Sequence, residues 1–358
     1  MSSTKKSNHL LKMIASRSVQ KSFRIELYAV LFCCMLTGCY QSESGQHEEL
    51  QEVAIGVTST YQGEAATYIA KERGFFELNG LNVTLKENPS GKISMRDLID
   101  GVVQIAHVAE TPVIYSIMDT SYFKGSGHPP FQIFADKIYS HDIQKIIGRR
   151  DHGITEAEDI VGKKVAIYQG TQLDYFFDSF LLEHQILNSE IEIVNMSPEK
   201  QIEAIKNGEI DVSVTWEPYS SYIQKELGEN AVHIDTDLTY STLWLSVALN
   251  SYASSHPDIL AAYLESIKMA QDYIRENPSD AQEILARKTN VPLDVIESLW
   301  TEIDFELSLS ERMLTLLEDQ ARWMIRNDLA DTTIQNMEEL INFGPMEQVH
   351  PIGITVVR

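Results

Sequence analysis

Short apolar runs alternate with amphipathic helical stretches along most of the chain. Val53–Val57 is an apolar run typical of a buried parallel strand. A loop over 58–63 leads into a predicted helix over 64–73, which Gly74 ends in the usual cap position. The pattern then predicts a strand over 81–85, a short helix over 95–100 and a strand over 102–108.

The same order of elements returns about 110 residues later. Its predicted members are a strand over 165–168, a turn over Gln169–Gln172, a helix over 173–185, a strand over 191–194, a helix over 198–207 and a strand over 208–214. Strands and helices that alternate in this way favour parallel sheets with right-handed crossovers. Two copies indicate two α/β lobes, although any two α/β segments share part of this pattern.

The rest of the chain is predicted to be mainly helical. An apolar strand over Leu243–Leu249 is followed by helical periodicity near 257–276, 279–288, 292–300, 309–327 and 332–342.

The first 38 residues have the pattern of an export signal. Six basic side chains precede the apolar run Leu27–Leu36, which is too short to span a bilayer. The run ends in Leu36-Thr37-Gly38-Cys39, which resembles a bacterial lipobox and implies that Cys39 becomes a lipidated N-terminus. An ordinary signal peptide with a chance cysteine is the alternative. The polar residues 39–51 are predicted to form a flexible tether.

Composition narrows the classes of partner. Loss of residues 1–38 removes six positive side chains and one negative side chain, so the net charge changes from −23 to about −28. Such a surface disfavours nucleic acid and anionic membranes as partners. The three cysteines are Cys33, Cys34 and Cys39, so the exported body has no thiol for a disulfide, a nucleophile or a zinc site.

Several stretches resemble the bacterial nitrate, sulfonate and taurine family of solute-binding proteins, which includes thiamine-precursor-binding members. They are Ala70–Glu77 with Gly80–Val83, Gly153–Thr155 with Asp159–Ala166, Gly208–Asp211 with Trp216–Tyr219, and His350-Pro351 to Val356-Val357. Their order and spacing span almost all of residues 51–358. Gln104 departs from the family, which usually has an aspartate there that corresponds to Asp211.

The resemblance implies an α/β, two-lobed periplasmic-binding-protein type II fold with two mixed sheets and helices on both faces. We expect the first lobe to comprise 52–140 and 241–358, and the second to comprise 141–240. A hinge of two crossing segments is expected near Ile138–Ile143 and Asp237–Thr242. It also implies a monomer that takes a small-molecule ligand, needs no cofactor and docks on the permease of an ABC transporter.

Ligands of open α/β sheets bind beyond the carboxyl ends of the strands, where loops meet helix N-termini. Two such loops, Thr60–Glu64 and Gln169–Gln172, are expected to face each other across the cleft, and their amides favour an oxyanion such as a sulfonate, carboxylate or nitrate. Gly170-Thr171 is equally well explained as a turn and a helix cap. The candidate ligand-binding residues are Tyr61, Glu64, Glu110, Thr111, Gly170, Thr171, Gln172, Trp216, Glu217 and Trp244.

The acidic candidates complicate a purely anionic ligand. If Glu110 or Glu217 points into the cleft, it repels an anion, and a zwitterion or amine fits better. Trp216 or Trp244 would then cover the cation or an apolar part of the ligand. A glutamate is more often a solvated or helix-capping residue, and a tryptophan is more often core.

Enzymatic interpretations have little support in the sequence. The histidines are scattered without metal-site spacing, and no nucleophile elbow, phosphate-binding loop or dinucleotide turn is present. His107 and Glu110 form an HxxE string on a predicted strand, where the two side chains would not share a face. Two alternatives stay open: an enzyme of menaquinone or thiamine-pyrimidine synthesis on the same fold, and a sensory receptor.

Overall fold

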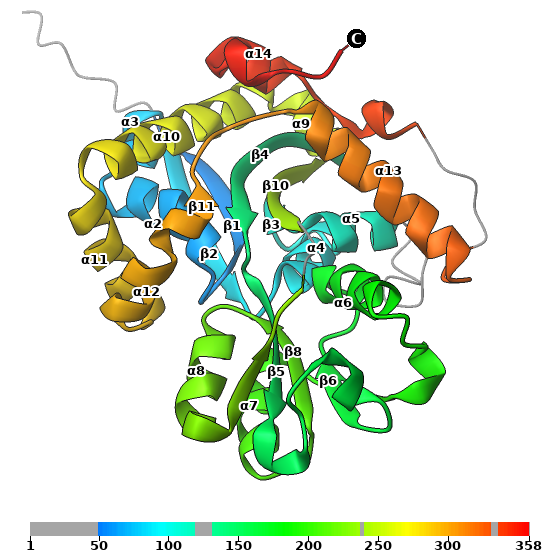
Figure 1. Cartoon of the computed structure of the whole chain (residues 1–358). Helices are drawn as coiled ribbons and strands as arrows, with labels where there is room; N and C mark the ends of the chain where they lie inside the picture. Colours follow the sequence, from blue (N-terminus) through cyan, green and yellow to red (C-terminus); the bar gives the residue numbers. More distant parts are fainter. Residues whose placement is uncertain (1–48, 119–130, 237–239, 331–335, 358) are drawn as a thin grey trace, which may run out of the picture. The chain divides into compact units, whose positions relative to one another are not determined.

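The computed structural model describes residues 49–118, 131–236, 240–330 and 336–357 (Figure 1). Leu50–Arg358 forms one compact unit. The predicted export signal, Cys39 and most of the predicted tether lie outside the described residues. Within the described part of the chain, no helix has the length and apolar character needed to cross a bilayer.

The first lobe is built on a six-stranded mixed sheet with the order β11-β4-β10-β3-β1-β2. β1 pairs in parallel with β2 and β3, whereas β10 is antiparallel to β3 and β4. The strands are β1 Gln51–Thr58, β2 Leu81–Asn88, β3 Ile105–Val108, β4 Phe131–His141, β10 Ser241–Leu249 and β11 Ile303–Asp304.

The second lobe is built on a five-stranded sheet with the order β7-β6-β8-β5-β9. β6 pairs in parallel with β7 and β8, and β5 is antiparallel to β8 and β9. The strands are β5 Gln144–Arg149, β6 Lys164–Ile167, β7 Glu192–Asn195, β8 Val212–Trp216 and β9 Ala231–Ile234.

The chain changes sheets twice. β4 ends at His141 in the first sheet, and β5 begins at Gln144 in the second. The return runs from Ile234 to Ser241, with residues 237–239 outside the described part. The Gln144 and Thr242 side chains are hydrogen-bonded to each other, which joins the two crossing segments at the centre of Figure 1.

Helices cover both sheets. In the first lobe, α2 and α10 pack against each other, and α13 packs on α5. The helices of this lobe are α2 Ala65–Glu72, α3 Phe75–Leu78, α4 Gly91–Ile99, α5 Glu110–Ile117, α9 Asn250–Ser255, α10 Pro257–Glu276, α11 Pro278–Thr289, α12 Leu293–Leu299, α13 Glu311–Arg326 and α14 Gly344–Val349. Those of the second lobe are α6 Gln172–Glu183, α7 Pro198–Lys206 and α8 Tyr219–Leu227.

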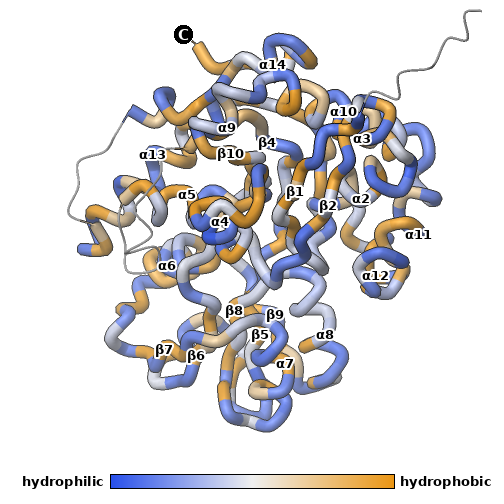
Figure 2. Tube along the Cα trace, turned by 180° about the vertical axis from the view of Figure 1, so that it is seen from behind, coloured by the Kyte–Doolittle hydropathy of each residue, from blue (hydrophilic) through white to orange (hydrophobic). Residues whose placement is uncertain are grey.

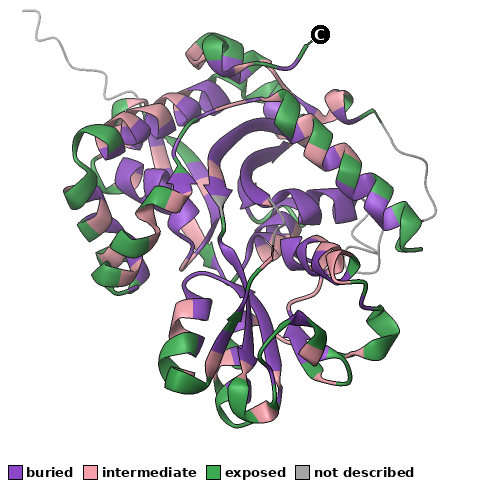
Figure 3. Cartoon of the chain, viewed as in Figure 1, coloured by how far each residue is buried: buried purple, intermediate pink, exposed green. Residues whose placement is uncertain are grey.

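The central strands are buried on both faces, which explains their nearly continuous apolar sequences. Figure 3 shows the strands of both sheets mainly in the colour of buried residues, with exposed residues on the outer sides of the helices. The helices alternate between hydrophobic and hydrophilic positions in Figure 2, as amphipathic helices on a sheet must. The predicted fold class is confirmed in these features.

Several predicted boundaries differ from the structure. α4 begins at Gly91, four residues before the predicted start, because Ser90 is its N-cap. The third strand begins at Ile105 rather than 102, since residues 97–103 form a hydrogen-bonded helix end and turn. The stretch from His350-Pro351 to Val356-Val357, which resembles the C-terminal strand of the family, makes a single bridge among the described residues, Leu309 to Ile354.

Candidate functional site

Five parallel strand ends, those of β1, β2 and β3 in one sheet and of β6 and β8 in the other, lead into one small cavity between the lobes. The cavity has a volume of about 10 Å³, which is room for about one water molecule. Its walls are Thr58, Tyr61, Ser90, Gly91, Lys92, Ala109, Pro112, Thr171, Gln172, Trp216 and Trp244. Because residues of both lobes line so small a space, an organic ligand enters only if the lobes separate.

The N-terminal turn of α4 forms one wall. Asn88 donates its side-chain amide to Ser94 Oγ at 3.2 Å and to Asp97 Oδ2 at 2.8 Å, which holds the loop after β2 against the helix. A Cβ atom on Gly91 would lie 2.9 Å from Val108 Cα and 3.0 Å from the Trp244 ring. Glycine is therefore required for this helix end to approach β3 so closely.

Lys92 supplies the positive charge of the cavity. Its Nζ donates to the carbonyl oxygen of Gln169 at 2.6 Å and lies 3.9 Å from the centre of the Tyr168 ring. Burial lowers the pKa of Lys92 to about 8, and Asp174 acts in the opposite direction. The side chain thus bridges the two lobes beside a space that favours an anion.

The start of α6 forms the opposite wall. Thr171 is the N-cap, and its Oγ1 accepts from Leu173 N at 3.4 Å while donating to Tyr168 O at 2.6 Å. Gly170 precedes it with a φ of 78° and donates its amide to Asp174 Oδ2 at 2.7 Å. Thr171 is therefore both the N-cap of α6 and part of the cavity wall. Its neighbour Gln172 also lines the cavity.

Aromatic rings cover the cavity. The Tyr61 and Trp244 ring centres lie 4.5 Å apart, and Trp216 packs on Tyr219 from the second lobe. Tyr61 Oη lies 3.2 Å from Ser140 Oγ, and burial raises the pKa of this phenol above its ordinary value. These rings give the site an apolar surface next to the Lys92 charge.

Glu64 does not line the cavity. Its buried carboxylate accepts from Trp244 Nε1 at 2.9 Å and from Lys137 Nζ at 2.9 Å, and it lies 2.7 Å from His107 Nδ1. Thr58 N and Thr67 Oγ1 each donate to it at 3.1 Å. Burial alone would raise the pKa of Glu64, but His107 and Lys137 hold it well below its usual range. The carboxylate therefore fixes the Trp244 ring rather than facing the ligand space.

The other acidic candidates are also engaged elsewhere. Glu110 accepts from the Tyr240 hydroxyl, from Leu243 N at 3.2 Å and from Gln320 Nε2 at 3.2 Å, and burial raises its pKa. Glu217 accepts from Ser221 N at 3.2 Å and from the Ser221 hydroxyl at 2.7 Å.

Glu110, Glu217 and the buried Thr111 are absent from the cavity wall. The structure thus separates the ten predicted residues into two groups. Tyr61, Thr171, Gln172, Trp216 and Trp244 come together at the cavity, and Gly170 adjoins it.

The Ser90-Gly91-Lys92 wall is not among the ten residues that the sequence predicts. The signal was available, because Asn88-Pro89-Ser90-Gly91 is a run of turn formers directly after a strand. No cluster of three histidine, cysteine, aspartate or glutamate side chains suited to a metal ion occurs among the described residues.

Comparison with known proteins identifies the family of the chain. The family model described as NMT1/THI5 like matches residues 63–281, more than half of the chain. The chain belongs to the NMT1/THI5-like family. A Bacillus subtilis (strain 168) relative named for aliphatic sulfonate binding is 23% identical over 316 residues, 87% of this chain and 91% of that protein. The taurine-binding periplasmic protein of Escherichia coli (strain K12) is 25% identical over 234 residues, 64% of this chain and 69% of that protein.

Solved structures confirm the expected periplasmic-binding-protein fold for this NMT1/THI5-like chain. The alkanesulfonate-binding protein SsuA from Xanthomonas axonopodis pv. citri, bound to MOPS, has a TM-score of 0.70 at 15% identity, covering 82% of this chain and 99% of that one. The desulfurization enzyme DSZB has a TM-score of 0.62 at 13% identity, covering 84% and 99%. The fold therefore occurs in both binding proteins and an enzyme.

Proposed function

We propose that this chain is an extracytoplasmic solute-binding protein that encloses a small sulfonate-like anion between its lobes. The carrying observation is that Lys92 and the first turns of α4 and α6 meet at one cavity. An ammonium group and the positive dipole ends of two helices both favour an oxyanion.

The placement of the acids supports an anion over an amine. Glu64, Glu110 and Glu217 have internal partners, so no predicted glutamate opposes a negative group in the cavity. The aromatic wall of Tyr61 and Trp244 suits the apolar part of an alkanesulfonate. A zwitterion such as taurine fits if its amine stays near a ring face.

Capture would proceed by closure of the two lobes about the crossing segments. The cavity is too small for a sulfonate as it stands, so the closed lobes must part to load a ligand. Delivery to an ABC permease is the role that agrees with the sulfonate-binding and taurine-binding relatives.

The decisive experiment is calorimetric titration of the purified chain with taurine, ethanesulfonate and nitrate. Lys92→Met should lower the affinity for the bound anion by about 10- to 100-fold, since a charge-assisted contact contributes about 1.5–3 kcal/mol. Lys200→Met is the matched control, because Lys200 is exposed and does not line the cavity. Unchanged affinity in Lys92→Met, or no binding of any of these anions, would reject the proposal.

The proposal includes membrane anchoring through Cys39, with residues 1–38 as the removed signal and 39–51 as the tether. The lobes would be 52–140 with 241–358, and 141–240, in a monomer. Metabolic labelling with a radioactive fatty acid tests the anchor: the parent should carry label and Cys39→Ser should not. Label in Cys39→Ser would contradict it.

A catalytic role is the competing proposal, since the fold includes a desulfurization enzyme. The sequence after Cys39 has no cysteine, so a cysteine nucleophile is absent from the exported body. Sulfite release from bound alkanesulfonate, measured over hours, would favour the enzyme. Binding with no turnover favours the receptor.

A further inference from the structure

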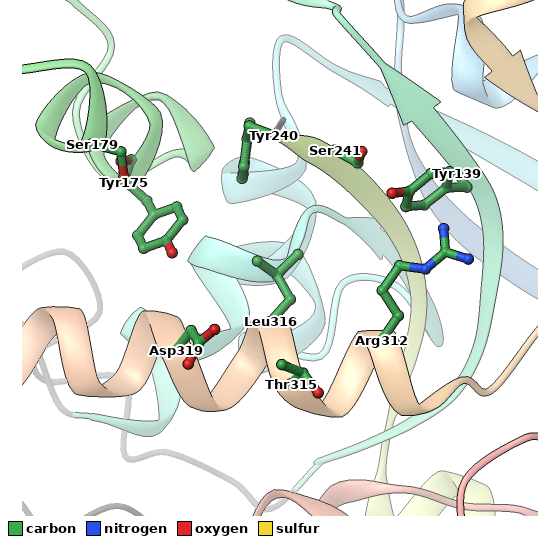
Figure 4. A pocket seen from close by; sticks show the side chains of 9 residues that line it. All are labelled: Tyr139, Tyr175, Ser179, Tyr240, Ser241, Arg312, Thr315, Leu316 and Asp319. Atoms are coloured by element: carbon green, nitrogen blue, oxygen red, sulfur yellow. The ribbon is translucent and has the colours of Figure 1, made fainter. Parts of the chain in front are cut away.

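A second and much larger pocket lies beside the hinge. Its volume is about 460 Å³, within the range of small-molecule sites. It is lined by α6 of the second lobe, by α13 of the first lobe and by the ends of both crossing segments (Figure 4). We call it the hinge pocket. The residues that carry its chemistry are Tyr139, Tyr175, Tyr240, Ser241, Arg312 and Leu316.

Hydrogen-bond donors dominate one end of the hinge pocket. The guanidinium carbon of Arg312 lies 3.8 Å from the centre of the Tyr139 ring, and no carboxylate of the described residues is within ion-pair distance of it. Ser241 is only 8% exposed, and its hydroxyl has no hydrogen-bond partner among the described residues. The buried, unsatisfied Ser241 hydroxyl is a costly arrangement that a bound acceptor would relieve, and the exposed Arg312 guanidinium in the same pocket is a second donor for that acceptor.

The rest of the wall is apolar and aromatic. Tyr175 and Tyr240 lie 5.8 Å apart between ring centres, and Figure 4 shows Leu316 pointing up from α13 between α6 and the crossing segment. Asp319 also lines the pocket, but Arg322 binds its carboxylate at 2.7 Å. Asp319 is seven residues from Arg312 on α13, about 10 Å along the helix axis.

We propose that the hinge pocket is a second binding site, for a small organic anion with an apolar body. The anionic group would accept from Arg312 and Ser241, and the body would pack on Tyr175, Tyr240 and Leu316. Such an occupant touches α6, α13 and a crossing segment at once, so it binds the closed lobes better than the open ones. The proposal does not depend on what the cavity at the strand ends binds.

Benzenesulfonate is a suitable probe, because it has one anionic group and one apolar ring. Calorimetric titration of the purified chain should show binding, and Arg312→Gln should weaken it at least about tenfold. Arg312→Lys should give an intermediate affinity, since it retains the charge without the planar fork. Arg275→Gln is the matched control, because Arg275 is an exposed arginine on α10 that does not line the pocket.

The variant Lys92→Met tests whether benzenesulfonate binds in the cavity at the strand ends instead of in the hinge pocket. That variant should keep the Arg312-dependent binding, whereas loss of all binding in Lys92→Met would overturn the proposal. Equal affinity in the parent and in folded Arg312→Gln, checked by circular dichroism, would overturn it too. So would an absence of benzenesulfonate binding to the parent at about millimolar concentration.

Discussion

Lys92 of α4 donates a hydrogen bond to the carbonyl oxygen of Gln169 across the gap between the two lobes, at 2.6 Å. The same ammonium lies over the Tyr168 ring. One side chain therefore holds the lobes together and supplies the positive charge of the cavity. An incoming anion competes with a carbonyl for this group, so lobe contact and ligand contact are coupled at Lys92.

Anion affinity should fall as the pH rises through about 8. Burial lowers the pKa of Lys92 from 10.5 to about 8, so the side chain is cationic below that pH and neutral above it. A bound anion favours the charged form, so binding should take up protons near this pH. Calorimetric titration over this range, in two buffers of different ionisation enthalpy, measures both effects.

The control for this pH dependence is Lys92→Met, whose weaker binding should be nearly independent of pH in the same range. If the parent keeps full affinity well above pH 8, Lys92 is not the group that pairs with the anion. The same pKa shift affects stability with the opposite sign. The unfolded chain holds this proton more tightly, so the contribution of Lys92 to folding becomes more favourable from about pH 8 to 10.5.

Glu64→Ala should destabilise the chain by about 3–5 kcal/mol, because it leaves Lys137 buried without its partner. Urea unfolding followed by circular dichroism measures this loss, with Glu203→Ala as an exposed control. If Glu64 were instead a ligand-binding residue with little structural role, the variant would lose affinity and keep its stability.

The same cluster should make the protein less stable in acid. The folded-state pKa of Glu64 lies below its ordinary 4.5, and burial lowers the pKa of His107 from 6.5 to about 4. A depressed folded-state pKa stabilises the protein above the unfolded value and is lost as the pH falls through the folded value. Stability should therefore decline from about pH 6.5 downward. A flat unfolding midpoint between about pH 6.5 and 4 would contradict this.

Periodicity was sufficient for the fold and only partly sufficient for the site. Most residues of Val53–Val57 and Val165–Ile167 are buried, and both runs are almost wholly apolar, so the sequence predicts a strand at each. Thr171 can be predicted from the sequence because it is the N-cap of a helix, and a helix cap depends on residues that are close to it in the sequence. Lys92 was missed because the helix pattern starts at Met95, whereas packing against β3 extends the helix back to Gly91.

The fate of the glutamates depended on contacts that sequence spacing does not show. The partners of Glu64 are 43 residues away at His107, 73 away at Lys137 and 180 away at Trp244. A carboxylate that meets such partners is structural, and the same carboxylate without them would be a ligand group. Only the tertiary fold decides between the two.

Gly91→Ala should damage both packing and binding. The added Cβ atom would lie 2.9 Å from Val108 Cα and 3.0 Å from the Trp244 ring, so α4 has to move away from β3. Overpacking of this kind costs about 1–3 kcal/mol. The free energy of unfolding and the affinity for ethanesulfonate should both fall. Gly344→Ala is the control, because its added Cβ atom would have its nearest contact at 3.3 Å and should change neither quantity by much. Full ethanesulfonate affinity in Gly91→Ala would show that the start of α4 does not touch the ligand.

Asp178→Ala should weaken lobe closure without touching the cavity. Asp178 of α6 accepts from Trp323 Nε1 at 2.8 Å and from Asn327 Nδ2 at 3.3 Å; Trp323 lies near the end of α13 in the first lobe and Asn327 is the C-cap of that helix. Loss of these bonds removes about 1 kcal/mol from the closed form only, because the open lobes do not make them. The affinity for ethanesulfonate should therefore fall about fivefold. X-ray scattering should show a larger radius of gyration without ligand and the parent value at saturation. The control is Asp294→Ala, because Asp294 is an exposed acid on α12. If Asp178→Ala binds ethanesulfonate as tightly as this control, the α6–α13 contact persists in the open form.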